Sequence, residues 1–495
     1  MRKTLLWGLL WLLLTNLLIK PFWLLGVDLS VQKAVGTETY GLYLAVFNLA
    51  YIFNILLDLG VTNFNTRNIA RNPLLVRKHL SGILSIKAVL LAVYAAATFA
   101  AGALLGYGSR QFALLAWLCL NQFLNSLITY LRSNFQGLLM FGMDSLLSVL
   151  DRVLMILICG LLLWGPGRGA PFRIEWFVYA QTAAYVAAAA AALAALWRKV
   201  GWHGLTWGRP FTVAILRRSA PYALLVLLMA SYNRLDPVLL QRLLPATGNY
   251  QAGIYGAAFR LLDALTTLTY LVSVPLLPVF ARQTQAARTG QGGQELRETA
   301  RMMSLMVLAA TFAIAAACGF FGQPILHALY GDKVSVGEVL PVFLVIVAGF
   351  VPIGLTYVFG TLLTANGSLR QLNILASVAL ALNVGVNLVL IPRHGAVGAA
   401  WASLAAQAFM GVSQTALACR LFRWRPSWGL ALRVAAYMLA VGLATWALAR
   451  GGMAARPWLG LALAALLAVA LASLLRLLDI REMARLLLPA GKGRG

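Results

Sequence analysis

Long apolar runs are the feature that most limits what this chain can fold into. About fourteen stretches of roughly 18 or more residues carry almost no charge, which is the length that a helix needs to cross ~30 Å of hydrocarbon. Strands of a membrane barrel would be about half as long and would alternate apolar and polar residues. The sequence therefore predicts an all-α, polytopic integral membrane protein. The approximate limits of the predicted spans are 5–28, 40–63, 80–105, 111–131, 145–165, 174–197, 219–244, 252–280, 300–322, 338–364, 372–392, 395–419, 428–449 and 457–478.

Composition and charge agree with a membrane location. A chain that is 61% hydrophobic and only 11% charged has more apolar surface than a water-soluble core can bury. The formal net charge of +26 would indicate nucleic-acid binding in a soluble protein. Here most of the Lys and Arg residues lie in every second loop, and these loops share one side of the membrane. This distribution is typical of positive-inside topology. We therefore expect an inner-membrane protein with both termini in the cytoplasm and no nucleic-acid partner.

The first span and the cysteines exclude two other interpretations. The first span is too long for a signal peptide, contains Lys20 and Pro21, and lacks a small-residue cleavage site, so we interpret it as a retained helix. The four cysteines have no disulfide or metal-ligand spacing. We expect no metal, no cofactor and no catalytic centre.

A short repeat divides the chain. GLYLAVF at 41–47 and GIYGAAF at 253–259 share four residues, each pair 212 positions apart. The helix before each motif carries a basic residue with a proline close behind it. Six predicted spans separate the two motifs, and an even number keeps both halves in one orientation, as in parallel transporter repeats. We predict six-helix bundles over 1–205 and 206–421, and an added helix pair with a basic tail over 422–495.

Three further stretches resemble a known family. They are LLDLGVTNFNTRNIAR at 56–71, GIYGAAFRLLDALTTLTYLVSVPLLPVFAR at 253–282, and LLTANGSLRQLNILASVALALNVGVNLVLIPRHGAVGAAWAS at 362–403. They are similar to Wzx-type oligosaccharide flippases of the multidrug/oligosaccharidyl-lipid/polysaccharide exporter superfamily. The third stretch is the most specific, and the resemblance runs over nearly the whole chain.

The resemblance implies both an architecture and an activity. The architecture is a pair of six-helix bundles that open alternately to the two sides of the membrane. The activity is transfer of a polyprenyl-diphosphate-linked oligosaccharide to the outer leaflet for surface polysaccharide assembly. The partners would be the lipid-linked glycan, membrane lipids and a downstream polysaccharide polymerase, and we expect a monomer.

The segment LLMASYNRLDPVLL at 227–240 contains the strongest candidate site residue. An ionised side chain near a bilayer centre costs about 3 kcal/mol on insertion scales, so intramembrane charges are usually functional or paired. Arg234 lies deep in its predicted span, and Pro237 weakens the helix directly after it. Both a substrate-cavity role and a buried ion pair with Asp236 fit this pattern.

Other intramembrane charges give a second group of candidates. Lys20, Arg152 and Arg260 would complete an anion-binding cavity with Arg234, because guanidinium groups match phosphate oxygens in charge and geometry. Pro21 would break the first helix as Pro237 breaks the seventh. Candidate gating or coupling residues are Asp58, Arg67, Asp236 and Asp263.

Local spacing gives expectations for three of these charges. Arg260 and Asp263 are three residues apart and can pair across one helical turn. Asp151 and Arg152 are adjacent, so we expect them to point apart toward partners on other helices. Lys87, near an inner helix end, is expected to extend its amine to the headgroups.

Three alternative functions remain open at this point. A cation-coupled drug antiporter would favour an acidic cavity, whereas these spans offer more base than acid. A MurJ-type lipid II flippase usually carries arginine in the first helix, where this chain has only Lys20. A membrane glycan polymerase or ligase would need acid, base or phosphate-binding groups on exposed loops, and the predicted loops are short. The flippase is therefore the leading prediction.

Overall fold

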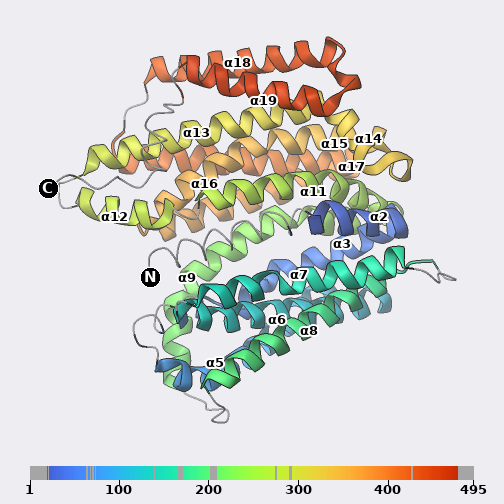
Figure 1. The fold of residues 1–495 in the computed structure, drawn as a ribbon, viewed down its shortest axis with the longest axis vertical. Helices are drawn as coiled ribbons and strands as arrows, with labels where there is room; N and C mark the ends of the chain where they lie inside the picture. The colour runs from blue at the N-terminus through green and yellow to red at the C-terminus, as the bar shows by residue number, and fades with distance from the viewer. Residues whose placement is uncertain are drawn as a thin grey trace. The chain divides into compact units, whose positions relative to one another are not determined.

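The computed structural model describes residues 19, 22–62, 65–66, 69, 72, 74–138, 140–165, 171–200, 209–273, 276–288, 292–424, 427–475 and 477. Every secondary-structure element in these ranges is helical, so the predicted all-α class is confirmed (Figure 1). Ten of these helices are long and apolar enough to cross a membrane. The number becomes eleven if the bent pair Tyr222–Arg234 and Asp236–Leu243 is one span.

The predicted number of fourteen spans stays a prediction. Most of the predicted span 5–28 lies outside the described residues. Two other predicted spans, 372–392 and 395–419, both lie in the single long helix α17 (Leu369–Leu421). Its 53 residues would extend about 80 Å if straight, but Gly395 has φ 54° and ψ −131° and separates two helical segments. The position predicted for that boundary is therefore correct.

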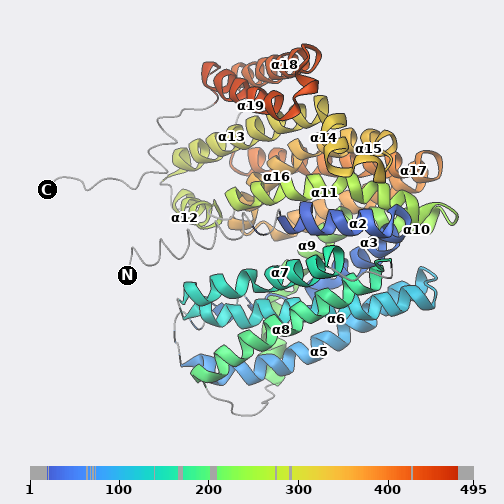
Figure 2. The same cartoon turned by 45° about the vertical axis from the view of Figure 1, so that its right-hand side comes forward.

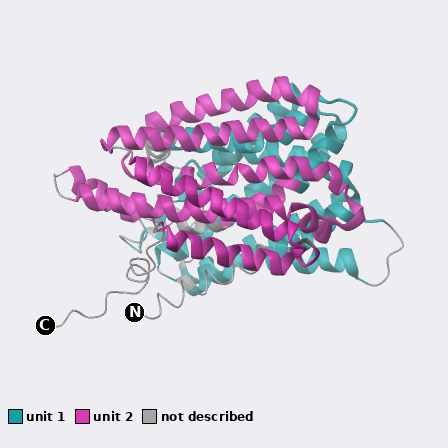
Figure 3. Cartoon of the chain, turned by 90° about the horizontal axis from the view of Figure 1, so that it is seen from above, with its two compact units in different colours: residues 1–257 teal, residues 258–495 magenta. Residues whose placement is uncertain are grey.

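The chain divides into two compact units, Met1–Ala257 and Ala258–Gly495 (Figure 3). The division falls inside α11 because α9 and α10 pack on α3 in the first unit. The predicted bundle limits of 1–205, 206–421 and 422–495 stay a prediction. The helices of the first unit are η1 (Trp23–Asp28), α2 (Leu29–Val35), α3 (Thr37–Ile52), η2 (Phe53–Leu57), α5 (Leu75–Leu104), α6 (Ser109–Gly137), α7 (Phe141–Trp164), α8 (Ile174–Val200), α9 (Arg209–Arg234), α10 (Asp236–Leu243) and the start of α11 (Gly248–Ser273).

Small residues let the helices of the first unit pack closely. In α8, Ala184, Ala188 and Ala192 follow one another at intervals of four and have no exposed surface. This stripe brings α8 against α6 and α7 (Figure 2), because alanine lets helix backbones approach each other. An aromatic and aliphatic core fills the same bundle, and Trp23 stacks on Phe177 there with ring centroids 5.8 Å apart.

Helix α3 does not cross the unit as one regular helix. It continues as the 3₁₀ helix η2, and then Leu59 (φ 43°) and Gly60 (φ 80°) take left-handed backbone conformations. Glycine accepts this conformation without a steric cost, whereas leucine does not. The break leaves Asp58 directly after η2.

The two repeated motifs lie against each other. A Cβ atom added to Gly41 would lie 1.8 Å from the Asn249 carbonyl oxygen and 2.6 Å from the Gly253 nitrogen. One added to Gly253 would lie 2.1 Å from the carbonyl oxygen of Thr37. Gln32 of α2 also donates to the Gly253 carbonyl oxygen at 3.2 Å. The glycine shared by the two motifs is therefore the residue through which α3 and the start of α11 touch.

We expect the Gly41→Ala substitution to separate these two helices. The new methyl group would overlap backbone atoms, which cannot move away as a flexible side chain can. The measurement is the spin-label distance between Glu38 and Thr247 by electron resonance, which should lengthen. The matched control is Gly442→Ala, since a Cβ at Gly442 meets nothing within 4 Å. An unchanged distance in Gly41→Ala would contradict the expectation.

The second unit is built around α13, α16 and α17. The added pair α18 and α19 packs on α13 (Figure 1), where Tyr437 donates to the Ala309 carbonyl oxygen at 3.1 Å. Ala468 and Ala472 of α19 join the same cluster. Its helices are the continuation of α11, α12 (Leu276–Arg288), α13 (Gly293–Phe320), α14 (Gly322–Tyr330), η3 (Gly331–Lys333), α15 (Val336–Ala348), α16 (Phe350–Ala365), α17 (Leu369–Leu421), α18 (Trp428–Arg450), η4 (Met453–Ala455) and α19 (Pro457–Leu474).

Candidate functional site

The segment 227–240 folds as two helices that meet at Leu235. Helix α9 ends at Arg234, and α10 begins at Asp236 with Pro237 in its first turn. The two helices are bent by 52°. Proline fits the first turn because the N–H that it lacks would have no partner within the helix there. Arg234 thus lies at the carboxyl end of a helix, where the helix dipole favours a positive charge.

Arg234 lies over an aromatic ring. Its guanidinium carbon is 5.2 Å from the centroid of the Tyr51 ring, and Tyr51 is 38% exposed. The arginine itself is half-buried. Such a cation–π contact fixes a guanidinium plane and leaves its edges to hydrogen-bond. One turn along from Tyr51, Asn54 donates a hydrogen bond to Gln122 of α6.

Asp236 lies in a different environment from Arg234. It has no exposed surface, and its Oδ2 accepts a hydrogen bond from the Tyr255 hydroxyl at 2.7 Å. A similar pair occurs at the start of α3, where Tyr40, directly before the other repeat motif, donates to Asp28 Oδ2 at 2.8 Å. In both cases an aspartate before the motif helix accepts from a tyrosine on it. Asp236 therefore joins α10 to the start of α11.

Arg152 lies on α7 beside the first described helical turns. Its guanidinium carbon is 5.7 Å from the centroid of the Trp23 ring, and its Nη1 is 3.7 Å from the sulfur of Met155. Its Nε is 3.6 Å from Asp151 Oδ2. The expectation that Asp151 and Arg152 point apart is therefore wrong, whereas the expected partner of Arg152 on another helix is found in Trp23. The arginine side chain is long enough to fold back to its neighbour, although adjacent residues diverge by about 100° around a helix.

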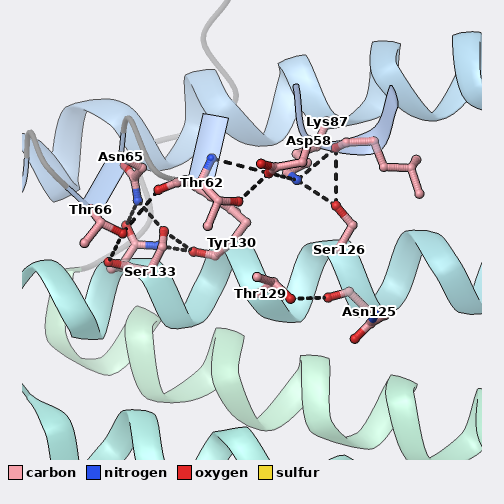
Figure 4. A network of polar contacts seen from close by, with 12 residues as sticks. Asp58, Thr62, Asn65, Thr66, Lys87, Asn125, Ser126, Thr129, Tyr130 and Ser133 are labelled. Carbon is pink, nitrogen blue, oxygen red and sulfur yellow. Dashed lines mark hydrogen bonds and ion pairs between the residues drawn. The ribbon is translucent and has the colours of Figure 1, made fainter. Parts of the chain in front are cut away.

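An ion pair joins the buried Lys87 to the partly exposed Asp58 (Figure 4). Lys87 Nζ donates to Asp58 Oδ1 at 2.9 Å, to the Leu57 carbonyl oxygen at 2.9 Å and to Ser126 Oγ at 2.8 Å. These three acceptors match the three donors of an ammonium group. The Lys87 side chain is 1% exposed, so the expectation that it extends to the headgroups is wrong.

The Asp58 carboxylate holds the break after η2. Besides Lys87, it accepts a hydrogen bond from the Thr62 hydroxyl and one from the Thr62 backbone N–H at 3.3 Å. The Asp58 side chain is 25% exposed. It can thus be reached from outside the core while the lysine cannot, which is compatible with the gating or coupling role predicted for Asp58.

The two predicted residues of the second unit, Arg260 and Asp263, lie on α11. Arg260 is 3% exposed and donates from Nη1 to the Tyr330 hydroxyl at 2.7 Å. Asp263 is half-buried, and its carbonyl oxygen accepts from the hydroxyls of Thr266 and Thr267. Arg260 is therefore anchored to another helix of its own unit.

Three predicted residues lie outside the described residues, namely Lys20, Pro21 and Arg67. The sequence reasoning also missed one buried charge pair. Arg132 Nε is 2.8 Å from Asp144 Oδ1, and Gln136 Nε2 donates to Asp144 Oδ2 at 3.0 Å. Arg132 was missed because it directly follows the predicted span 111–131, whereas α6 continues to Gly137. Extending that span by one residue would have included Arg132, and beginning the next predicted span, 145–165, one residue earlier would have included Asp144.

Metal binding has no support among the residues that the structure describes. No group of three or more His, Cys, Asp or Glu side chains is placed there to hold an ion. The chemistry available in the first unit is instead that of a guanidinium group, aromatic rings and amide or hydroxyl groups.

The fold is that of multi-pass membrane transporters. The structure of the lipid II flippase MurJ in an inward closed conformation has a TM-score of 0.68 at 12% identity, with 96% of this chain and 99% of that chain covered. A multidrug resistance MATE family transporter of the MOP superfamily, in an inward-facing conformation, has a TM-score of 0.65 at 15% identity, covering 81% and 94%. A MOP superfamily transporter from Pyrococcus furiosus has a TM-score of 0.57 at 15% identity, covering 84% and 95%.

The sequence itself gives the family. Residues 5–284 match the model of the family described as polysaccharide biosynthesis protein. This is more than half of the chain, so the protein belongs to that family. No curated protein matches the sequence. The family match confirms a protein of polysaccharide biosynthesis, and the fold is the one found in transporters of the MOP superfamily.

Proposed function

We propose that the protein is an alternating-access flippase for a polyprenyl-diphosphate-linked oligosaccharide. It would move this lipid from the cytoplasmic to the outer leaflet of the inner membrane and release it to a downstream polymerase. The observation that carries the proposal is Arg234, a guanidinium held on the Tyr51 ring at a helix break within a membrane span. A diphosphate is the part of such a lipid that a guanidinium binds in two-point fashion.

The family description supports the glycan, and the charges support the phosphate. The family is one of polysaccharide biosynthesis, so a lipid-linked saccharide is the cargo that fits both the family and a membrane-spanning fold. Arg152 is a second guanidinium of the first unit and lies against the Trp23 ring. Lys20 and Arg260 stay in the proposed anion-binding set, and Asp58, Arg67, Asp236 and Asp263 stay proposed gating residues.

Lipid II transport is the second candidate, because the chain resembles the structure of the lipid II flippase MurJ over 96% of its length. Mass spectrometry of lipids co-purified with the protein separates the two. We expect a polyprenyl diphosphate that carries an oligosaccharide without a peptide. A peptide-bearing disaccharide would favour the second candidate, and repeated recovery of bulk phospholipids alone after gentle extraction would count against both.

We expect outward flipping to proceed without an ion gradient. A diphosphate of about two negative charges gains ~2.3 kcal/mol per charge for each 100 mV of inside-negative potential, unless a countercharge moves with it. The measurement is flipping in reconstituted vesicles with a potassium diffusion potential and with neither a proton nor a sodium gradient. Flipping that appears only after such a gradient is added would show that ion coupling is obligatory.

A further inference from the structure

Helix α6 carries a polar stripe within a membrane span. The stripe follows one face because successive members are three or four residues apart. Such groups are rare in a span unless they face protein or water. The members of the stripe are Gln122, Asn125, Thr129, Arg132 and Gln136.

The stripe lies opposite the face of α6 that suits lipid. Trp117 and Leu120 are 40% and 38% exposed. A helix turns 100° per residue about its axis, so Thr129 lies about 150° around α6 from the mean direction of these two side chains. Thr129 is exposed and Asn125 is half-buried. Helix α6 therefore has two accessible faces, one apolar and one polar, and the Asn125 amide on the polar face requires water or a polar ligand as its partner.

The accessible members of the stripe lie in the carboxyl-terminal half of α6. One turn before Gln122 on the same face, Leu118 is 1% exposed. Figure 4 shows Asn125 and Thr129 side by side, with the threonine hydroxyl donating to the Asn125 carbonyl oxygen at 2.8 Å. The Asn125 amide and the oxygen lone pairs of Thr129 lie on this accessible part.

The stripe carries no net charge. Its one ionised member, Arg132, is paired with Asp144 from α7 at 2.8 Å, and Gln136 binds the other oxygen of that carboxylate. The remaining groups are amides and a hydroxyl, which both donate and accept hydrogen bonds. This is the complement of sugar hydroxyl groups, whereas a phosphate would require an excess of positive charge.

The stripe is continuous with the Arg234 region. Arg234 lies on Tyr51, Asn54 follows Tyr51 by one turn, and Asn54 hydrogen-bonds Gln122 at the start of the stripe. A ligand whose phosphate is held at Arg234 thus has a row of neutral polar groups beginning one helical turn away.

We propose that the carboxyl-terminal half of the α6 stripe, led by Asn125 and Thr129, binds the glycan of the substrate and selects for glycan length. The inference rests on the proposed flippase function and extends it. The diphosphate is held by arginine, and the saccharide is held by α6. A lipid diphosphate with a single sugar would then lack most of the contacts to the stripe.

The test uses two probes prepared from the organism's own membranes. One is the lipid-linked oligosaccharide fraction, and the other is the free oligosaccharide released from it by mild acid. The variant is Asn125→Leu/Thr129→Val, which removes the hydrogen-bonding groups at similar volume. Calorimetry should show that the free oligosaccharide binds wild-type protein and binds the variant about tenfold more weakly, the loss expected for a few net hydrogen bonds.

Flipping of two lipids completes the test. The variant should slow flipping of the oligosaccharide lipid about tenfold and slow flipping of a one-sugar polyprenyl diphosphate much less. The single substitution Thr129→Ser keeps the hydroxyl group. This variant should therefore bind the free oligosaccharide as wild-type protein does. The matched control is Thr445→Val in α18, which removes the same type of hydroxyl-to-carbonyl bond. Melting temperatures of all variants verify folding.

Each adverse result has its own meaning. The proposal that α6 binds the glycan is wrong if the wild-type protein does not bind the free oligosaccharide. It is also wrong if the folded variant binds the free oligosaccharide as tightly as the wild type. Both conclusions hold even where flipping persists. Equal slowing of both lipids would also overturn it, because selection by length would be absent. If the glycan binds but wild-type protein flips neither lipid, the flippase function itself is wrong.

Discussion

Replacing Arg234 with alanine is expected to lower flipping of the lipid-linked oligosaccharide at least about 100-fold, because two charge-assisted hydrogen bonds to the diphosphate disappear. The side chain is half-buried and rests on one face of the Tyr51 ring. We expect the melting temperature to fall only slightly. Arg234→Lys should keep part of the activity, since it retains the charge but loses the planar two-point geometry. Flipping rate and melting temperature are measured on the same protein samples.

The competing explanation is that Arg234 is scaffold. Loss of one partner of a buried ion pair costs about 3–5 kcal/mol, so Arg234→Ala would then unfold at a much lower temperature. Removing Asp236 as well would restore stability if the two residues formed that pair. We expect no such recovery, because Asp236 accepts a hydrogen bond from Tyr255 and its loss adds a second defect. A large loss of stability that the Arg234→Ala/Asp236→Ala variant recovers would identify Arg234 as structural.

Replacing Lys87 with alanine is expected to lower the free energy of unfolding by about 3–5 kcal/mol. The substitution would leave Asp58, the Leu57 carbonyl and Ser126 without the ammonium group that binds all three. The break after η2 would lose the side chain that holds Leu57 and Asp58 in place. The measurement is thermal unfolding in detergent, followed by the fluorescence of a thiol-reactive dye at the buried Cys119 and Cys159.

Two further variants make the Lys87 prediction specific. Lys87→Met/Asp58→Asn removes both charges and keeps most of the volume, so it should be more stable than Lys87→Ala. Lys199→Ala removes an exposed lysine from α8 and should change stability by less than about 0.5 kcal/mol. Equal melting temperatures for Lys87→Ala and Lys199→Ala would show that the ion pair contributes nothing to stability.

The membrane-spanning class was predictable from the sequence because it depends on local composition and length. A helix satisfies its own backbone hydrogen bonds, so an uncharged run of sufficient length is enough to identify a span. Boundaries that depend on one residue were also accessible, as at Gly395. The helix end at Arg132 was harder to place, because helices continue past the apolar part of a span.

Side-chain partners were much less predictable. Lys87 has the sequence position of a residue that extends to the headgroups, but the break after η2 brings Asp58 within 2.9 Å of its amine. Asp151 and Arg152 should diverge as helical neighbours, but the flexible arginine returns to the aspartate at 3.6 Å. Both results depend on rotamers and on packing from helices distant in sequence, which spacing along one helix does not encode.

The sequence by itself determined that this is a membrane protein, its helical class, its superfamily resemblance and the break at Pro237. Each of these features depends on short segments of the chain. Only the tertiary structure decided which charges meet, that Gly41 and Gly253 form a backbone contact, and that α6 has a polar face opposite its apolar one. The physical reason is that a contact between distant segments depends on how whole helices pack. Arg234 shows both parts: its position at a helix break follows from the sequence, and its place on the Tyr51 ring follows from the fold.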